Sequence, residues 1–415
     1  MHEVTFQCGS CHKDLSETYL QTMHGKSYEL GHEKAAKCSD CHGAHNILNV
    51  NNPASMVSAR NIVTTCQNFH EDANMRFTGY LTHATHHDKV KYPALYYTYW
   101  LMTTLLVSVF GIFGIHTLLW LPRSIQGIKN RREEEKVKGK KYYIKRFSGN
   151  HRITHFFVII SFMALALTGM VLKFANMDWA KTLANLMGGP QVAGLIHRFA
   201  AIITFGYFLF HIISLVKMKK RLHKTWFQFI FDSESMMFNL QDLKDFGATM
   251  KWFFGMGPRP AYGRWTYWEK FDYFAVFWGV AVIGFSGLML WFPEFFTQFV
   301  PGWIINIAQI IHSDEALLAV GFIFTVHFFN THLRPESFPM DTVIFTGLVT
   351  LEEFKRTRPR EYAELKESGQ LRKKLVKHEA DPKWERAVKI FGTIWLLLGV
   401  SLIVLIIYSV LFGYQ

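Results

Sequence analysis

The sequence predicts an all-α protein in which a six-helix transmembrane bundle follows a loop-rich N-terminal domain. Half of the 415 residues are hydrophobic and 16% are aromatic. Six apolar runs reach the roughly 20 residues that a bilayer-spanning helix needs. All five cysteines precede the first run. The runs lie near 95–121, 152–174, 194–217, 271–293, 309–332 and 387–411. The expected units are an N-terminal domain (1–94), an extra transmembrane helix (95–121), a basic loop (122–150), a four-helix unit (151–345), a charged segment (346–386) and a C-terminal helix (387–415).

The N-terminal domain carries two C-x-x-C-H motifs, C-G-S-C-H at 8–12 and C-S-D-C-H at 38–42. This pattern is the attachment signature of c-type haem, in which two thiols bond the haem edge and the histidine binds iron. A zinc or disulfide framework does not explain a histidine after each cysteine pair. The expected attachment residues are Cys8, Cys11, Cys38 and Cys41, and the expected iron ligands are His12 and His42.

A third motif, C-Q-N-F-H at 66–70, lacks one thiol, because Phe69 stands where the second cysteine would be. Cys66 and His70 still suffice for a haem held by a single thioether bond, which is the favoured interpretation. A non-covalent haem at this position, or none, remains the alternative.

Ten of the twenty histidines lie in residues 1–94. This density favours low-spin haems with two histidine ligands, an arrangement suited to electron transfer. Beyond the motif histidines there are seven candidates for the second ligand. In order of preference they are His24, His45, His83, His86, His87 and His32, with His2 also available.

Lysine and arginine placement predicts the orientation of the spans. The segments 122–150, 217–270 and 333–386 carry ten, ten and twelve of these residues, whereas 175–193 has only Lys181 and 294–308 has none. The basic segments are therefore expected in the cytoplasm, and the haem domain and C-terminus in the periplasm of a bacterium. The formal charge of +13 follows from this topology and does not indicate nucleic-acid binding. Only seven residues precede Cys8, so we expect a mature or truncated product, or a misassigned start, with further haem motifs upstream as one possibility.

Ionisable residues inside a bilayer are costly and are functional candidates by default. His197 and His211 share the third run, and His312 and His327 share the fifth, separated along each helix by roughly 21 and 22 Å. His197 and His312 are expected at matching depth near the periplasm, with His327 near the cytoplasm. Two stacked b-type haems would then connect the two faces of the membrane. By depth, either His211 or His155 completes the inner haem.

Three stretches resemble the cytochrome b subunit of membrane formate dehydrogenases and the related subunit of nickel-iron hydrogenases. They are R-I-T-H-F-F-V-I-I-S-F-M-A-L-A-L-T-G (152–169), G-G-P-Q-V-A-G-L-I-H-R (188–198) and I-I-H-S-D-E-A (310–316), within a similarity covering roughly 145–345. The resemblance implies His155 with His327 at the inner haem and His197 with His312 at the outer one.

This chain departs from that family in three respects. The spacing from His312 to His327 is one residue longer, His211 has no counterpart, and the first helix with His116 is extra. A third b-haem between His116 and His211 is one interpretation, and two buried, hydrogen-bonded histidines are the other.

The combination of a multihaem head with this bundle is similar to inner-membrane quinol:cytochrome c oxidoreductases of metal- and sulfate-reducing bacteria. It implies electron transfer between menaquinone and periplasmic multihaem cytochromes, with the chain acting as a quinol dehydrogenase. The alternative is a non-catalytic haem-bearing anchor and conduit for a formate, hydrogen or sulfur enzyme. A haem-based sensor is a third and weaker hypothesis, because no signalling domain is visible.

In the resembled family the quinone meets the inner haem. Candidate residues that line its site and relay protons are His151, His332, Arg334 and Asp341. Arg152, Arg198 and Arg146 are candidate partners of haem propionates, because a guanidinium binds a carboxylate through two hydrogen bonds.

Three further segments carry expectations. Asp314 and Glu315 suggest a proton exit or a helix cap. Residues 225–262 are expected to lie at the membrane interface, and 351–386 to form a solvated helix of alternating charge. No P-loop, dinucleotide fingerprint or iron-sulfur cysteine set occurs.

Overall fold

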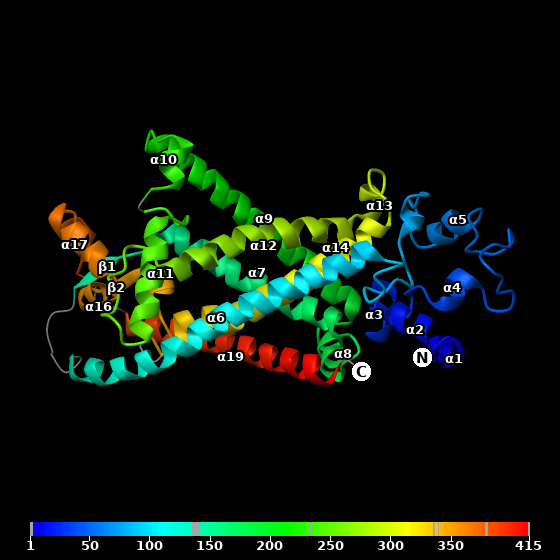
Figure 1. Ribbon diagram of the computed structural model, residues 1–415, viewed down its shortest axis with the longest axis horizontal. Helices are drawn as coiled ribbons and strands as arrows, with labels where there is room; N and C mark the ends of the chain where they lie inside the picture. Colours follow the sequence, from blue (N-terminus) through cyan, green and yellow to red (C-terminus); the bar gives the residue numbers. More distant parts are fainter. Residues whose placement is uncertain are drawn as a thin grey trace.

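The computed structural model describes residues 3–134, 142–232, 234–334, 337–338, 340–377 and 381–413. His2 and the centre of the basic loop, at 135–141, lie outside these ranges. The molecule is elongated, with the N-terminal domain, here called the head, at one end of a helical bundle and a small mixed unit at the other (Figure 1). We refer to these as the head end and the far end.

All six predicted spans are confirmed as long apolar helices, so the chain is a multi-pass membrane protein. Their starts follow local rules: Ser148 accepts a hydrogen bond from His151 N, Pro190 occupies a first turn, and Thr266 forms a capping box with Glu269. The spanning helices are α6 (Pro93–Glu134), α7 (Gly149–Lys173), α9 (Pro190–Arg221), α12 (Tyr267–Trp291), α14 (Trp303–Phe322) and α19 (Pro382–Phe412).

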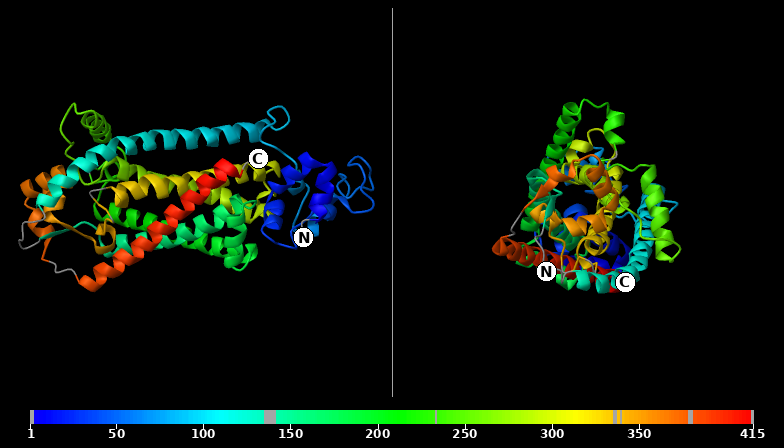
Figure 2. Two further views of the ribbon diagram at one scale, coloured as in Figure 1. Left: turned by 90° about the horizontal axis from the view of Figure 1, so that it is seen from below. Right: turned by 90° about the vertical axis from the view of Figure 1, so that its left-hand side faces the viewer.

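Helices α7 and α9 pack together, as do α12 and α14, and the extra helices α6 and α19 flank this four-helix core (Figures 1 and 2). Two glycines bring the flanking helices close. A Cβ on Gly321 of α14 would lie 2.4 Å from the Phe110 ring of α6, and a Cβ on Gly399 of α19 would lie 2.7 Å from the Phe324 ring. Both flanking helices therefore contact the core through an aromatic ring seated on a glycine.

Helix α14 continues as two π-helical segments, η2 (Ile323–His327) and η3 (Phe329–Leu333). A π-helical turn accommodates one residue more than an α-helical turn, and such turns are frequent at functional sites. The long spacing from His312 to His327 is thus accommodated within the helix.

The head consists of short helices joined by turns. It docks on the bundle through backbone contacts: Gly302 N donates to Arg76 O at 2.8 Å, and Asn306 exchanges two 3.0 Å hydrogen bonds with the backbone of Leu81. The head elements are α1 (Glu3–Cys11), α2 (Lys13–Leu20), α3 (Met23–Glu29), α4 (Cys38–His42), α5 (Ile62–Gln67) and η1 (Phe77–Gly79), and α8 (Asp178–Leu186) and α13 (Pro293–Phe296) lie at the same end of the bundle.

The far end contains a three-stranded antiparallel sheet of order β2-β1-β3. An all-α fold is therefore wrong for this unit, because strands of two or three residues are too short to show alternation in the sequence. The solvated helix predicted for 351–386 is also wrong, since Phe354 and Leu365 pack against Ile144 and Val349 in a buried core. The elements are β1 (Tyr143–Lys145), α15 (Val343–Thr346), β2 (Leu348–Thr350), α16 (Leu351–Thr357), α17 (Pro359–Glu367), α18 (Leu371–Lys374) and β3 (Leu375–Val376).

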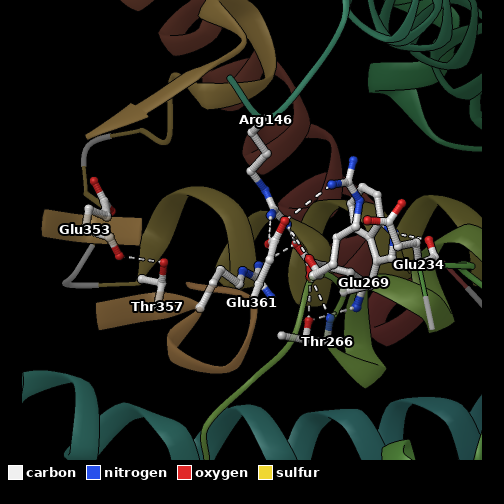
Figure 3. A network of polar contacts seen from close by, with 10 residues as sticks. Arg146, Glu234, Thr266, Glu269, Glu353, Thr357 and Glu361 are labelled. Carbon is white, nitrogen blue, oxygen red and sulfur yellow. Dashed lines mark hydrogen bonds and ion pairs between the residues drawn. The ribbon is translucent and has the colours of Figure 1, made fainter. Parts of the chain in front are cut away.

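A network of ion pairs ties this unit to the start of α12 (Figure 3). Arg146 approaches Glu269 at 3.4 Å and Glu361 at 3.5 Å, and Arg358 reaches Glu269 at 2.7 Å. Burial lowers the pKa of Arg146 to about 10 despite these carboxylates. Arg146, expected to bind a propionate, is therefore already matched by two carboxylates of the chain.

Residues 225–262 form α10 (Trp226–Ile230) and α11 (Leu240–Phe253), neither of which is a candidate span. Helix α11 is fixed to α12 by a buried ion pair of 2.9 Å between Asp242 and Lys270. Its opposite side exposes Leu240 and Leu243. This two-sided character matches the expectation of a non-spanning amphipathic helix.

Candidate functional site

A cavity of about 1500 Å³ runs through the four-helix core from Lys26 of the head to Arg358 at the far end. It is lined by the four histidines that the resemblance implies as ligands: His155, His197, His312 and His327. The structure brings these residues together as two groups, one toward each end of the bundle.

His197 and His312 form the head-side pair. Their ring centroids are 6.2 Å apart. A metal ion bound at about 2 Å by a ring nitrogen on each side places two ring centres roughly 6 Å apart. The pair therefore has the separation that one iron between two imidazoles requires.

Hydrogen bonds set the tautomers of the head-side pair. His312 Nδ1 lies 3.0 Å from the Ile283 carbonyl, which can only accept, so Nδ1 carries the proton. Thr168 donates its own hydroxyl proton to Ala164 O at 2.6 Å and lies 2.8 Å from His197 Nδ1, from which it accepts. Both Nε2 atoms are thereby left without a proton and are free to bind a metal.

Two glycines make room for the head-side rings. A Cβ on Gly169 would lie 3.5 Å from His197 Cε1, and one on Gly287 would lie 2.9 Å from His312 Cε1. Each glycine follows a hydroxyl residue, Thr168 on α7 and Ser286 on α12. The two halves of the bundle thus present the same hydroxyl-glycine pair to a histidine on the next spanning helix.

His155 on α7 and His327 in η2 form the far-side pair and lie close enough to interact electrostatically. His327 Nδ1 is 2.8 Å from Asp272 Oδ2 on α12, which orients the ring. His332 follows His327 by five residues, which is the hydrogen-bond spacing of a π-helix. It lies close enough to both members of the far-side pair to interact with them electrostatically. Its Nδ1 is buried and has no hydrogen-bond partner among the described residues.

The two histidines considered for a third haem each contact a tyrosine of α12. His116 Nε2 lies 2.5 Å from Tyr267 Oη, and His211 Nε2 lies 2.8 Å from Tyr273 Oη. In the structure His155, and not His211, accompanies His327. Both histidines are thus hydrogen-bonded, as one of the two interpretations expects, although only His116 is buried and His211 is half-buried.

The head contains two further histidine pairs at the separation expected for a shared iron. Ring centroids are 6.0 Å apart for His24 and His70, and 6.4 Å apart for His42 and His83. His70 Nδ1 lies 2.6 Å from Glu294 Oε1 of α13. Each pair thus joins a motif histidine to one of the residues preferred as a second ligand.

The thiols lie on the turns that precede the motif histidines. In α1 and α4 the cysteines are three residues apart and share a helix face, and Cys66 lies in α5. Burial and the neighbouring Cys66 raise the pKa of the Cys41 thiol to about 11, and burial also raises that of Cys66. The second and third motifs therefore lie side by side.

The remaining head candidates are placed differently. His86 stacks on Tyr99 with 4.0 Å between the ring centroids, and its ring lies 4.1 Å from that of His87 in a tilted contact. No histidine ring contact is seen for His12, His32 or His45 within the described part of the chain, although His32 lines the head end of the cavity.

The predicted quinone-site residues occupy the far end. His151, His332, Arg334 and Asp341 all line the cavity. Burial raises the pKa of the Asp341 carboxyl to about 6. The Arg334 guanidinium, however, lies 3.9 Å from the centre of the Trp120 ring in a cation–π contact and donates to Asn330 Oδ1 at 2.7 Å.

Of the predicted propionate partners, Arg146 and Arg198 line the cavity, whereas Arg152 is not among the lining residues. Arg152 Nε donates to Phe345 O at 2.6 Å, and Arg198 lies over the Trp291 ring at 5.7 Å.

Asp314 and Glu315 do not cap a helix, because α14 begins at Trp303, and that alternative is wrong. Asp314 pairs with Lys173 at 3.0 Å, facing the head. Burial, with Lys173 adding to it, lowers the pKa of the nearby Lys26 to about 8. Glu315 is buried, and its Oε2 has no partner among the described residues.

Sequence reasoning missed Asp272, Glu294 and the hydroxyl-glycine pair of α12. The first could have been noticed as a carboxylate within an apolar run, which is a functional signal by itself. Glu294 carries no such signal, because its partner His70 is 224 residues away.

Comparison with known proteins agrees with this geometry. No family model matches the chain. The cytochrome b556(fdo) subunit of formate dehydrogenase from Escherichia coli K12 is 22% identical over 231 residues, which are 54% of this chain and 94% of the subunit. The same subunit from the O6:H1 and O157:H7 strains gives identical figures. The chain is thus a multi-pass membrane protein that is distantly similar, over about half of its length, to the cytochrome b556 subunit of formate dehydrogenase.

Proposed function

We propose that this protein transfers electrons between the menaquinone pool and periplasmic c-type cytochromes, as a quinol:cytochrome c oxidoreductase. The observation that carries the proposal is the head-side and far-side histidine pairs at opposite ends of one cavity, with two further pairs in the docked head. Iron held between two histidines is suited to electron transfer rather than to binding a substrate.

The cofactors we propose are two b-type haems and three c-type haems. His197 with His312 and His155 with His327 would hold the b-type haems. His70 with His24 and His42 with His83 would hold two c-type haems, the first through one thioether at Cys66. His12 with Cys8 and Cys11 would hold the third. Bound haem iron supplies one-electron exchange between its ferric and ferrous states.

We place the quinone at the far end, near His332. Its Nδ1 is buried beside the far-side pair and finds no hydrogen-bond partner in the described part of the chain, as expected for a group that binds a quinone oxygen. Quinol oxidation releases two electrons and two protons. Asp341, whose pKa of about 6 lies near neutrality, and His151 are the groups proposed to carry the protons. Arg334 is instead assigned to packing against Trp120.

The proposed location is a bacterial inner membrane, with the head and the C-terminus in the periplasm. The basic far end would then face the cytoplasm, in agreement with the distribution of lysine and arginine.

Stopped-flow mixing of the oxidised, purified protein with a menaquinol analogue tests the function. The b-type α-bands should reduce first and the c-type bands second. His332→Leu should slow the first phase, whereas Leu209→Ala, at an exposed position on α9 that does not line the cavity, should not. Absence of any reduction by quinol, with full reduction by dithionite, would overturn the proposal.

A second candidate is a non-catalytic anchor and conduit for a separate periplasmic enzyme. The similarity to a formate dehydrogenase subunit favours it. A catalytic subunit that co-purifies stably in mild detergent would support this alternative, and a chain that purifies alone and oxidises quinol would exclude it.

A further inference from the structure

Asp272 is a carboxylate inside a membrane span that contacts a proposed haem ligand. It lies on α12 and lines the cavity, and its Oδ2 is 2.8 Å from His327 Nδ1. Because a carboxylate only accepts, His327 Nδ1 donates the proton and Nε2 is left for the metal. Asp272 therefore acts on the iron position through the imidazole ring.

Within the described residues, no group other than His327 compensates the negative charge of Asp272. Its Oδ1 is buried and has no hydrogen-bond partner, and no lysine or arginine forms an ion pair with it. An unpaired charge in a low-dielectric interior is costly, so such groups are normally matched by an opposite charge. A ferric haem with two neutral histidine ligands carries one net positive charge, which is lost on reduction.

Among the residues that the structure describes, no carboxylate forms a hydrogen bond with either ring of the head-side pair. His312 Nδ1 donates to a backbone carbonyl at 3.0 Å, and His197 Nδ1 donates to the Thr168 hydroxyl at 2.8 Å. These partners are neutral. The two ligand pairs thus have the same kind of axial ligands but differ in the charge of the group behind the ring.

We propose that Asp272 is a positioning residue that lowers the reduction potential of the far-side haem below that of the head-side haem. This inference rests on the proposed function, since it presumes a haem at each pair. A carboxylate hydrogen-bonded to Nδ1 increases the electron donation of the ring and stabilises the ferric state. The resulting difference in potential favours movement of an electron from the far end toward the head.

Spectropotentiometric titration of the purified holoprotein tests this inference. Asp272→Asn keeps the size and an acceptor oxygen but removes the charge. It should raise the reduced-to-oxidised ratio of one b-type haem, at a fixed ambient potential, by roughly tenfold. The largest electron paramagnetic resonance g value of the same haem should also shift, because it reports the electron donation of the axial histidines.

Thr168→Val provides the matched variant for the head-side pair, since it removes the hydrogen-bonding hydroxyl at constant shape. It should change the potential of the other b-type haem only. In the unsubstituted protein, the haem that Thr168→Val does not affect should have the lower potential, a test that stands even if Asp272→Asn does not assemble. An equal or higher potential for that haem, or equal shifts of both haems in Asp272→Asn, would overturn the inference. A protein that lacks b-type haem by pyridine haemochrome analysis would overturn the proposed function as well, which distinguishes the two failures.

Discussion

Glu294 holds the ring of His70 across the interface between the head and the bundle. Glu294→Gln removes the negative charge that contacts this proposed ligand, so the haem proposed at His70 should become easier to reduce. At a fixed ambient potential, the ratio of reduced to oxidised haem should rise by roughly tenfold. The c-type α-band in a redox titration measures this. Glu71→Gln, an equal charge change on an exposed neighbour, serves as control. A similar shift in both variants would mean that only net charge matters.

Asp341 offers a prediction on stability. Burial raises its pKa from 3.8 to about 6, so the folded state binds the proton more tightly than the unfolded state does. This contribution to stability should therefore rise as pH falls from about 7 to about 4. Asp341→Asn should abolish that part of the pH dependence of the melting temperature in detergent, as measured by differential scanning fluorimetry. The exposed Asp381→Asn should retain it, and a pH profile unchanged by Asp341→Asn would contradict the assignment.

Sequence patterns predicted the histidines better than the residues that act on them. Motif spacing pointed to His42 and His70, and the resemblance pointed to the four bundle histidines that the structure pairs, because these signals are local. Asp272 lies 55 residues from its partner His327. Only the packing of α12 on α14 brings the two together, and no sequence window contains that information.

Among the elements, Gly302 controls the docking of the head. A Cβ at this position would lie 2.3 Å from the backbone N of Tyr80 and 2.7 Å from Arg76 O. Its φ of −56° suits any residue, so Gly302→Ala changes only this contact. Overpacking of this kind costs about 1–3 kcal/mol.

Gly302→Ala should therefore loosen the head. We expect faster limited proteolysis of the head and slower reduction of the c-type haems by the b-type haems, with the b-type phase unchanged. Gly206→Ala is the control, because nothing lies within 4 Å of its Cβ position. Identical proteolysis of both variants would show that the interface adjusts.

The spans were predictable because an unbroken run of roughly 20 apolar residues matches the length of a helix that crosses the hydrocarbon core of a bilayer. The far-end sheet was not, because β1, β2 and β3 come from three separate segments and contain only eight residues in total, three, three and two. The alternating charges of residues 351–386 are typical of a solvated helix. The sequence of this segment does not show that Phe354 packs against Ile144, which comes from a distant part of the chain.

At the scale of the whole molecule, both ends of the described chain lie toward the head (Figure 2). Trp179 of α8 donates to Ser409 near the end of α19 at 2.8 Å. An alkaline phosphatase fused after Gln415 should therefore be active in a bacterial host, and one fused after Lys377 should be inactive. Green fluorescent protein at the same sites should give the reverse pattern. Activity at both sites would contradict the proposed topology.

The three strands of the far-end sheet also impose an order on biosynthesis. Val376 of β3 follows Lys145 of β1 by 231 residues in the sequence, so β3 is synthesised much later than β1. At a synthesis rate of about 5–20 residues per second, β3 is made on the order of tens of seconds after β1. Four spans, α7, α9, α12 and α14, are made during this interval, before the far-end sheet is complete. The unit at the far end of the bundle is therefore completed only after the spans that carry all four paired bundle histidines have been synthesised.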